Sequence, residues 1–389
     1  MIADQTQGAP RSLYVHIPFC ARRCSYCDFA ISLGGGAIQD RYVAALDQEL
    51  EGLGPLGHLE LDTVFLGGGT PSLLRADLLE QVVEVIRTRF RLSSSAEVTI
   101  EANPEGLTED LVRTWRRLGI NRVSLGVQSL DPAGLRFLGR AHDAVAAETA
   151  MDLVAAAGFE NLSCDLIYAI PGQDSASFAR GLLQVLTHPV QHVSCYELTV
   201  EPGTPLARRV QRKLAPAPAV DAFLEQREIA GELLGSAGLG IYEVSNYAKP
   251  GFASRHNLAY WTQLPYLAVG CGSHGFLSAA SAALLGLEPK GDMLRYWHLR
   301  DAATYIREVM AGGLGWRGHE WLGPAEVEME RVACGLRLAA GVILRGDGQL
   351  TRAKELSELG LLTLEGQLVR PTKRGFALLD RVTLELCAA

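Results

Sequence analysis

The segment YVHIPFCARRCSYCDF, residues 14–29, places Cys20, Cys24 and Cys27 close together directly after a short apolar run. Their spacing is C-x3-C-x2-C, and the apolar run over residues 12–17 predicts a strand. Thiolates this close to one another favour zinc, copper(I) or an iron–sulfur cluster. The segment therefore predicts a metal site in a loop that follows a strand.

The missing fourth cysteine helps to choose between these metals. A structural zinc ion needs four ligands, and His16 lies on the predicted strand rather than in the loop. Iron–sulfur clusters also usually take four thiolates, so three would leave one iron open to another ligand. Chance clustering of core cysteines is disfavoured, because Arg22, Arg23 and Ser25 interrupt any apolar pattern. We expect an iron–sulfur cluster, with zinc as the weaker alternative.

Short apolar runs alternate with helical patterns through the first 240 residues. Between the first two runs, for example, Tyr42, Leu46 and Leu50 fall on one helical face. Such an alternation predicts a parallel sheet wrapped by helices, and hence an α/β fold. The runs that predict strands are residues 12–17, 62–69, 97–103, 121–129, 161–170 and 192–200.

Chemically useful groups stand at the end of each predicted strand. A barrel collects such groups at the C-terminal ends of all its strands, whereas an open sheet concentrates them at one crevice. We therefore predict a partial (β/α)6 barrel of the TIM type over residues 1–240, with one central site. After the cysteine loop, the groups at the strand ends are Gly67, Gly68 and Gly69, then Glu101, Gln128, Asp165 and Glu197.

The alternation of strands and helices is lost after about residue 240, so we predict a second, smaller α+β region over residues 241–389. Its tail has a helical pattern, a short hairpin that turns at Glu365 and Gly366, and a final helix, an arrangement like a winged helix. The net charge of −8 and the lack of a basic recognition helix argue against nucleic acid as a partner.

The composition is that of a globular protein, with 48% hydrophobic and 21% charged residues among 389. The first twelve residues lack the basic and apolar parts of a secretory signal, and no run of about 18 apolar residues occurs. Five of the eight cysteines are scattered singly, as expected of reduced thiols. We expect a cytoplasmic protein with no transmembrane segment.

The cysteine spacing, with Tyr26 before the last cysteine, resembles the radical S-adenosylmethionine superfamily. This resemblance implies that Cys20, Cys24 and Cys27 bind a [4Fe-4S] cluster and that S-adenosylmethionine chelates the fourth iron. It also implies a partial barrel and an electron donor such as a flavodoxin or ferredoxin.

Further segments extend the resemblance along the predicted barrel. LGGGTPS is similar to the family segment that binds the amino group of the methionine moiety, and its glycines allow the backbone to approach a ligand closely. IEANPE, LGVQS, LGRAH and DLIYAIPG match polar positions that contact the cofactor in relatives. The residues that the resemblance assigns to cofactor binding here are Tyr14, Tyr26, Gly68, Gly69, Thr70, Glu101, Gln128, Arg140 and Asp165.

The resemblance covers nearly the whole chain and narrows to two groups, the oxygen-independent coproporphyrinogen III oxidases and the HemW-type haem chaperones. The oxidases carry a further cysteine two positions after the third, where this chain has Phe29, and a longer N-terminal arm. HNLAYW, residues 256–261, matches the haem-associated HNxxYW motif of the HemW-type group. Both features favour the chaperone group.

The motif also makes chemical sense as part of a haem site. A neutral imidazole such as that of His256 is a good axial ligand for haem iron, and Tyr260 and Trp261 suit contact with a porphyrin face. His274, in GCGSHGF, is a second candidate ligand.

The function implied by the resemblance is a haem chaperone that binds haem, a [4Fe-4S] cluster and S-adenosylmethionine. It would deliver haem to an acceptor haemoprotein, such as a membrane respiratory enzyme, and we assign no catalytic residue. The alternative is a radical enzyme that decarboxylates porphyrinogen propionates in haem biosynthesis. A purely structural iron–sulfur protein would not explain the glycine-rich loop and the polar strand ends.

Overall fold

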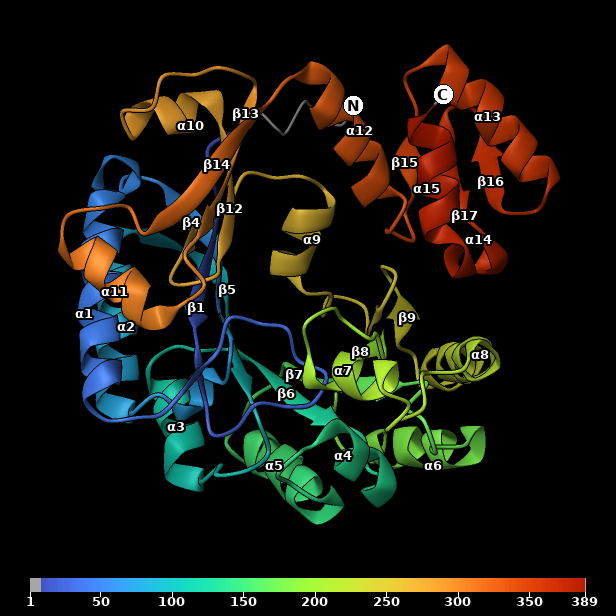
Figure 1. Ribbon diagram of the computed structural model, residues 1–389, viewed down its shortest axis with the longest axis horizontal. Helices are drawn as coiled ribbons and strands as arrows, with labels where there is room; N and C mark the ends of the chain where they lie inside the picture. Colours follow the sequence, from blue (N-terminus) through green and yellow to red (C-terminus); the bar gives the residue numbers. More distant parts are fainter. Residues whose placement is uncertain (1–7, 389) are drawn as a thin grey trace.

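The computed structural model describes residues 8–388, and its largest element is a curved sheet of nine strands (Figure 1). The strand order is β11-β1-β4-β5-β6-β7-β8-β10-β9. Six neighbouring strands in this order pair in parallel and follow one another along the chain, as predicted. They are β1 (Ser12–Ile17), β4 (Glu60–Gly68), β5 (Arg91–Ala102), β6 (Arg122–Gln128), β7 (Leu162–Tyr168) and β8 (His192–Glu197).

Helices cover the convex side of this sheet, from α1 at the left of Figure 1 to α6 and α8 at the right. Asp131, Asp143 and Asp174 begin three of them as N-caps, each accepting a hydrogen bond from a backbone N–H of the first turn. The helices of this part are α1 (Ala37–Gly52), α2 (Ala76–Arg89), α3 (Glu109–Arg117), α4 (Pro132–Leu138), α5 (Ala144–Ala156), α6 (Ser175–Val185), α7 (Pro205–Gln211) and α8 (Val220–Ser236).

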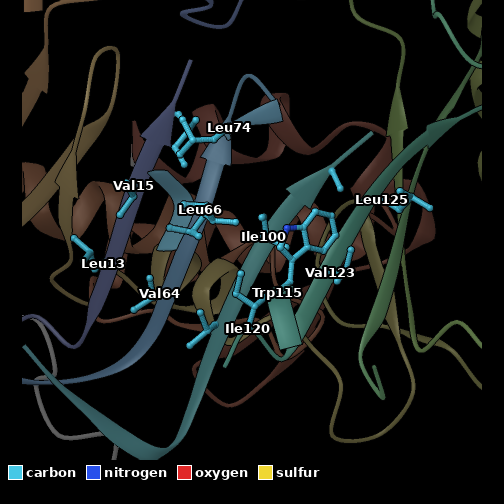
Figure 2. Close-up of a cluster of buried hydrophobic side chains, with 14 of the residues drawn as sticks. Leu13, Val15, Val64, Leu66, Leu74, Ile100, Trp115, Ile120, Val123 and Leu125 are labelled. Carbon is cyan, nitrogen blue, oxygen red and sulfur yellow. The ribbon is translucent and has the colours of Figure 1, made fainter. Parts of the chain in front are cut away.

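The main core lies between the sheet and these helices. Strands that are buried on both faces have nearly continuous apolar sequences, and the parallel strands could therefore be predicted from the sequence. Figure 2 shows part of this core, where β1 and β5 contribute Leu13 and Ile100 and α3 contributes the fully buried Trp115. The predicted α/β fold with a partial barrel is therefore confirmed.

Three short strands from beyond residue 239 extend the sheet at its two edges. Strand β11 (Leu267–Val269) pairs in parallel with β1, while β10 (Asn246–Ala248) pairs antiparallel with β8 and with β9 (Gly240–Ile241). The main core also continues as far as Val309. The boundary at residue 240 stays a prediction, because the two predicted regions share this sheet and this core.

The region after the barrel contains a small antiparallel sheet in the order β12-β13-β14. One of its helices, α11, packs against α1 of the barrel. The elements are α9 (Arg255–Trp261), β12 (His274–Ser278), α10 (Ala279–Leu284), β13 (Met293–His298), α11 (Ala302–Met310) and β14 (Trp316–Leu322).

The tail has a hydrophobic core of its own and lies at the upper right of Figure 1. Its hairpin turns at Gly366, whose φ of 63° lies in the left-handed region that favours glycine. Of the helices in residues 8–388, none is both long and apolar enough to cross a membrane. The tail consists of α12 (Pro324–Gly335), β15 (Val342–Ile343), α13 (Asp347–Glu358), β16 (Leu362–Glu365), β17 (Leu368–Pro371), α14 (Lys373–Ala377) and α15 (Leu379–Cys387).

Candidate functional site

A cavity of about 410 Å³, the first cavity, lies at the C-terminal ends of the parallel strands. Its position agrees with the rule that barrels build their sites at this end of the sheet. Most of the residues that the sequence predicts for a metal or cofactor site meet here. Those that line it are Cys20, Cys24 and Cys27, together with Tyr26, Gly68, Gly69, Thr70, Glu101, Gln128, Arg140 and Asp165.

The two ends of the cysteine loop pair with each other, and its middle is hydrogen-bonded to the barrel. It begins at β2 (Phe19–Cys20), which pairs in parallel with β3 (Ser32–Leu33) beyond the loop. In the middle, the backbone N–H of Ser25 donates to the carbonyl of Leu138 at 3.1 Å, and the carbonyl of Ser25 accepts from the N–H of Leu206 at 2.7 Å. These bonds hold the three cysteines over the ends of the strands.

The three thiols have surroundings that suit an iron–sulfur cluster. Burial raises the pKa of Cys20 to about 11 and raises the pKa of Cys27, and the neighbouring thiols add to both effects. A cation bound beside Cys20 and Cys27 would therefore favour their thiolate forms. Within residues 8–388, no three His, Cys, Asp or Glu side chains converge on the position of a single metal ion. A four-iron cluster does not need this, because each thiolate bonds a different iron.

The glycines of LGGGTPS have a packing role that the sequence did not reveal. A Cβ atom on Gly69 would lie 2.5 Å from the carbonyl oxygen of Pro18, and one on Gly68 would lie 2.5 Å from the ring of His16. The end of β4 can therefore approach β1 and the start of the cysteine loop only without side chains at these positions.

Two partly buried acids line the first cavity, Glu101 on β5 and Asp165 on β7, and β6 lies between these two strands. Glu101 accepts a hydrogen bond from the N–H of Gly68 at 2.9 Å, and burial raises its pKa to about 7. Burial also raises the pKa of Asp165, which accepts from the hydroxyl of Ser124 at 3.1 Å. Acids with raised pKa values in a cavity are typical of functional sites.

Asn103 is a residue of this site that the sequence analysis missed. Its Nδ2 donates to Thr70 Oγ1 at 3.0 Å, and its Oδ1 accepts from Arg140. Asn103 stands two positions after Glu101 in IEANPE, so the two-residue period of a strand could have placed both side chains on the same face. Asn103 thus connects the glycine-rich segment to Arg140.

Gln128 lies at the end of β6 with a φ of 64°, a left-handed conformation that is uncommon for a residue with a side chain. The pairing between β6 and β7 shifts register between Leu125 and Gln128. Such strained positions cluster at ligand sites.

A second cavity, of about 420 Å³, adjoins the first. Tyr14, predicted to contact the cofactor, lines this second cavity and not the first, and so does Tyr260. The two cavities share Asp28, Phe29, Gly68 and Glu101, and the second is completed by His16, Ala30, Tyr266, Gly272, Ser273, His274 and Arg300.

His256 is placed in the core and lines neither cavity. Its Nδ1 is 2.7 Å from Thr63 Oγ1, its Nε2 is 2.7 Å from the hydroxyl of Tyr260, and its ring stacks on Phe65. Burial lowers its pKa to about 3. In this placement neither ring nitrogen is open to haem iron, contrary to the expectation for an axial ligand.

Trp261, the last residue of the motif, also lies away from both cavities. The guanidinium carbon of Arg337 lies 5.7 Å from the centre of its ring, which is the distance of a cation–π contact. Trp261 is therefore in contact with the C-terminal tail rather than with a ligand cavity.

The family model and the similar proteins point to one family, and the similar proteins match almost the whole chain. Residues 14–180 match the radical SAM superfamily model. The protein named heme chaperone HemW from Mycobacterium tuberculosis is 37% identical, and the alignment covers 97% of this chain and 95% of that protein. The HemW of Bacillus subtilis is 31% identical, with 94% and 96% covered.

The solved structure of the coproporphyrinogen III oxidase HemN from Escherichia coli superimposes with a TM-score of 0.82. The match covers 98% of this chain and 91% of the oxidase, at 21% sequence identity. At that identity the match shows a shared fold and leaves the function open. The HemW proteins match over a similar share of the chain but at a higher identity of 31–37%, so the chain belongs to the HemW family of the radical SAM superfamily.

Proposed function

We propose that this protein is a haem chaperone, which binds haem and delivers it to an acceptor haemoprotein. The observation that carries the proposal is the similarity over almost the full length to proteins named heme chaperone HemW, at 37% identity over 97% of the chain. Family membership that spans both the barrel and the region after it supports a shared function better than a match to the barrel alone would.

The first cavity is the proposed site of the [4Fe-4S] cluster and S-adenosylmethionine. Cys20, Cys24 and Cys27 would hold three irons, and a cluster bound there would offer its fourth iron to the amino and carboxylate groups of S-adenosylmethionine. Asn103 and Arg140 both line the cavity and are joined by a hydrogen bond. Tyr26, Gly68, Gly69, Thr70, Glu101, Gln128, Arg140 and Asp165 are the proposed contacts to S-adenosylmethionine.

The partners and the location in the cell belong to the same proposal. The acceptor would be a haemoprotein such as a membrane respiratory enzyme, and a flavodoxin or ferredoxin would reduce the cluster. We propose that the chain works in the cytoplasm, where its eight cysteines would stay reduced.

The competing function, oxidative decarboxylation of porphyrinogen propionates, has the shared fold in its favour. Against it stands Phe29, which occupies the position of the further cysteine of the oxidases. Its side chain is 59% exposed at the edge shared by the two cavities. We therefore place decarboxylation second.

A haem titration of the anaerobically reconstituted full chain tests the proposal. We expect a Soret band that saturates at one haem per chain, transfer of that haem to an apo-haemoprotein, and no turnover of coproporphyrinogen. A wild-type protein that shows no saturable Soret band but decarboxylates coproporphyrinogen would overturn the proposal in favour of the oxidase.

A further inference from the structure

The second cavity has the size and composition of a small-molecule site. Its volume of about 420 Å³ lies within the range usual for ligand pockets. Its wall combines aromatic side chains, among them Tyr14, Tyr260 and Phe29, with a few polar groups. Because it shares a wall with the first cavity, a ligand bound here would lie beside the proposed cluster.

His274 brings an accessible imidazole to this cavity. It is the first residue of β12, it is exposed, and it lines the second cavity. Within residues 8–388, no hydrogen bond affects the pKa of the His274 ring. Both ring nitrogens of His256, in contrast, are hydrogen-bonded, one to Thr63 and the other to Tyr260. His274 therefore has a nitrogen lone pair that a metal can reach without disturbing the core.

The HNxxYW motif contributes to the same cavity through its tyrosine. A hydrogen bond of 2.7 Å joins Nε2 of His256 to the hydroxyl of Tyr260. The ring of Tyr260 packs edge-on against the ring of Tyr266, with the ring centroids 4.5 Å apart. Both tyrosines line the second cavity. His256, which does not itself line the cavity, thus fixes the orientation of Tyr260, which does.

The rim of the cavity carries an apolar ring and a cation. Phe29 is largely exposed, although large apolar side chains are usually buried, and it is in place to cover a flat apolar ligand. The guanidinium of Arg300 donates to the backbone carbonyl of Asp28, which leaves further N–H donors for an anionic group. A porphyrin that carries propionates has both of these features, a flat apolar ring and carboxylates at one edge.

We propose that the second cavity is the haem site of this protein and that His274 is an axial ligand of the iron. Arg300 pairs with a haem propionate, and Phe29 covers part of the porphyrin face. His256 is a positioning residue that acts through Tyr260. The inference rests on the proposed chaperone function and adds the location and the ligand of the haem.

The test is a titration of the reconstituted full chain with ferric protoporphyrin IX, in wild type, His274→Ala and His58→Ala. We expect the His274→Ala variant to bind at least about tenfold more weakly, because loss of even an outer partner of a metal ligand costs this much. Its Soret band should shift, and free imidazole should restore the wild-type band. His58→Ala, at an exposed histidine away from both cavities, should titrate like wild type.

A second titration uses metal-free protoporphyrin IX, which has the same ring and propionates but no iron. We expect His274→Ala to bind it like wild type, whereas Arg300→Glu should weaken it, because the new charge repels the propionate. Equal binding by Arg300→Glu and wild type would overturn the assignment of the propionate contact.

The outcomes separate this inference from the function on which it rests. A wild-type chain with no saturable Soret band would overturn the proposed function. A saturable wild-type band that His274→Ala leaves unchanged would overturn the inference alone. Loss of the band in His256→Ala, with an unchanged circular dichroism spectrum and with His274→Ala still normal, would return the axial ligand to His256.

Discussion

The guanidinium of Arg140 connects to the cysteine loop through Cys24, with Nη1 of Arg140 3.5 Å from Cys24 Sγ. The other end of the same guanidinium, Nη2, donates to Gly126 O at 3.0 Å and to Asn103 Oδ1. Arg140 is therefore held in place by Gly126 of β6 and by Asn103, directly after β5, and it reaches a thiol that comes from 116 residues earlier in the chain. A fixed positive charge beside a cluster ligand stabilises added electrons.

Replacing Arg140 by Gln should lower the reduction potential of the reconstituted cluster. The variant loses a cation and an N–H donor directed at a ligand sulfur, and both stabilise the reduced cluster. A redox titration followed by electron paramagnetic resonance measures the change. Arg180→Gln, at an exposed arginine on α6, is the control and should keep the wild-type potential. A potential in Arg140→Gln that is equal to or higher than in wild type would contradict this expectation.

Replacing Cys24 by Ala should abolish cluster binding after anaerobic reconstitution. Two thiolates rarely retain a four-iron cluster, and no other cysteine lines the first cavity within residues 8–388. Iron and sulfide analysis and the visible absorption spectrum measure the loss. Cys387→Ala removes a thiol of the C-terminal tail and should leave the iron content as in wild type. An unchanged spectrum in Cys24→Ala would sink the proposed ligand set.

The parts of the fold that were predicted correctly are those with a local pattern. The six parallel strands are buried runs between amphipathic helices, and both patterns can be read from the sequence. Strands β9, β10 and β11 were missed, because they have only two or three residues each and exist by pairing with the edges of the sheet. Nothing local distinguishes such segments from loops.

The candidate site also has one part that the sequence predicts and one part that it does not. Parallel strands end at one edge of a sheet, so Glu101 and Asp165 were predicted to meet although they lie on different strands, and both line the first cavity. Asp165 lies in the middle of β7 rather than at its end. The environment of His256 was not predictable, because its partner Thr63 comes from a strand 193 residues earlier. A histidine beside aromatic residues has the same local sequence whether it is a ligand or part of the core.

Gly69→Ala should destabilise the protein by about 1–3 kcal/mol, the usual cost of extra volume in a packed interior. The new Cβ would lie 2.5 Å from Pro18 O and 3.0 Å from Phe19 O, the two carbonyls directly before Cys20. We also expect weaker binding of S-adenosylmethionine, because the cysteine loop must move. Thermal unfolding and equilibrium binding measure the two effects.

The control for this variant is Gly35→Ala, because a Cβ there would meet no atom within 4 Å. Its melting temperature and cofactor affinity should match those of wild type. If Gly69→Ala were as stable as this control, close packing would not be the reason for glycine at position 69.

Phe29→Cys should not confer decarboxylation of coproporphyrinogen. The substitution adds a thiol at the edge shared by the cavities, but it adds no contact that would orient a porphyrinogen for radical attack. Anaerobic incubation of the reconstituted variant with coproporphyrinogen and a reductant, followed by product analysis, measures the activity. Phe29→Ser separates loss of the ring from gain of the thiol. Turnover by the Cys variant but not the Ser variant would show that one residue separates the chaperone from the oxidase.

Glu243 should make the stability of the protein fall as the pH rises towards neutrality. It is 1% exposed, between β9 and β10, and burial raises its pKa from the usual 4.5 to about 7. Between these values the folded chain holds a proton that the unfolded chain has released. The free energy of unfolding therefore decreases from about pH 4.5 to pH 7 through this group, by at most about 3 kcal/mol.

Glu243→Gln keeps the shape of the side chain and an oxygen that can accept from the N–H of Ser245. It removes the titration, so its free energy of unfolding should fall less than that of wild type between pH 5 and pH 7. Urea unfolding at the two pH values measures the difference. Glu80→Gln, at an exposed position on α2, should keep the wild-type dependence. The prediction depends on the cost of burying a charged carboxylate away from water. If the free energy of unfolding of Glu243→Gln and of wild type changed equally with pH, water would reach this carboxyl group in the folded protein.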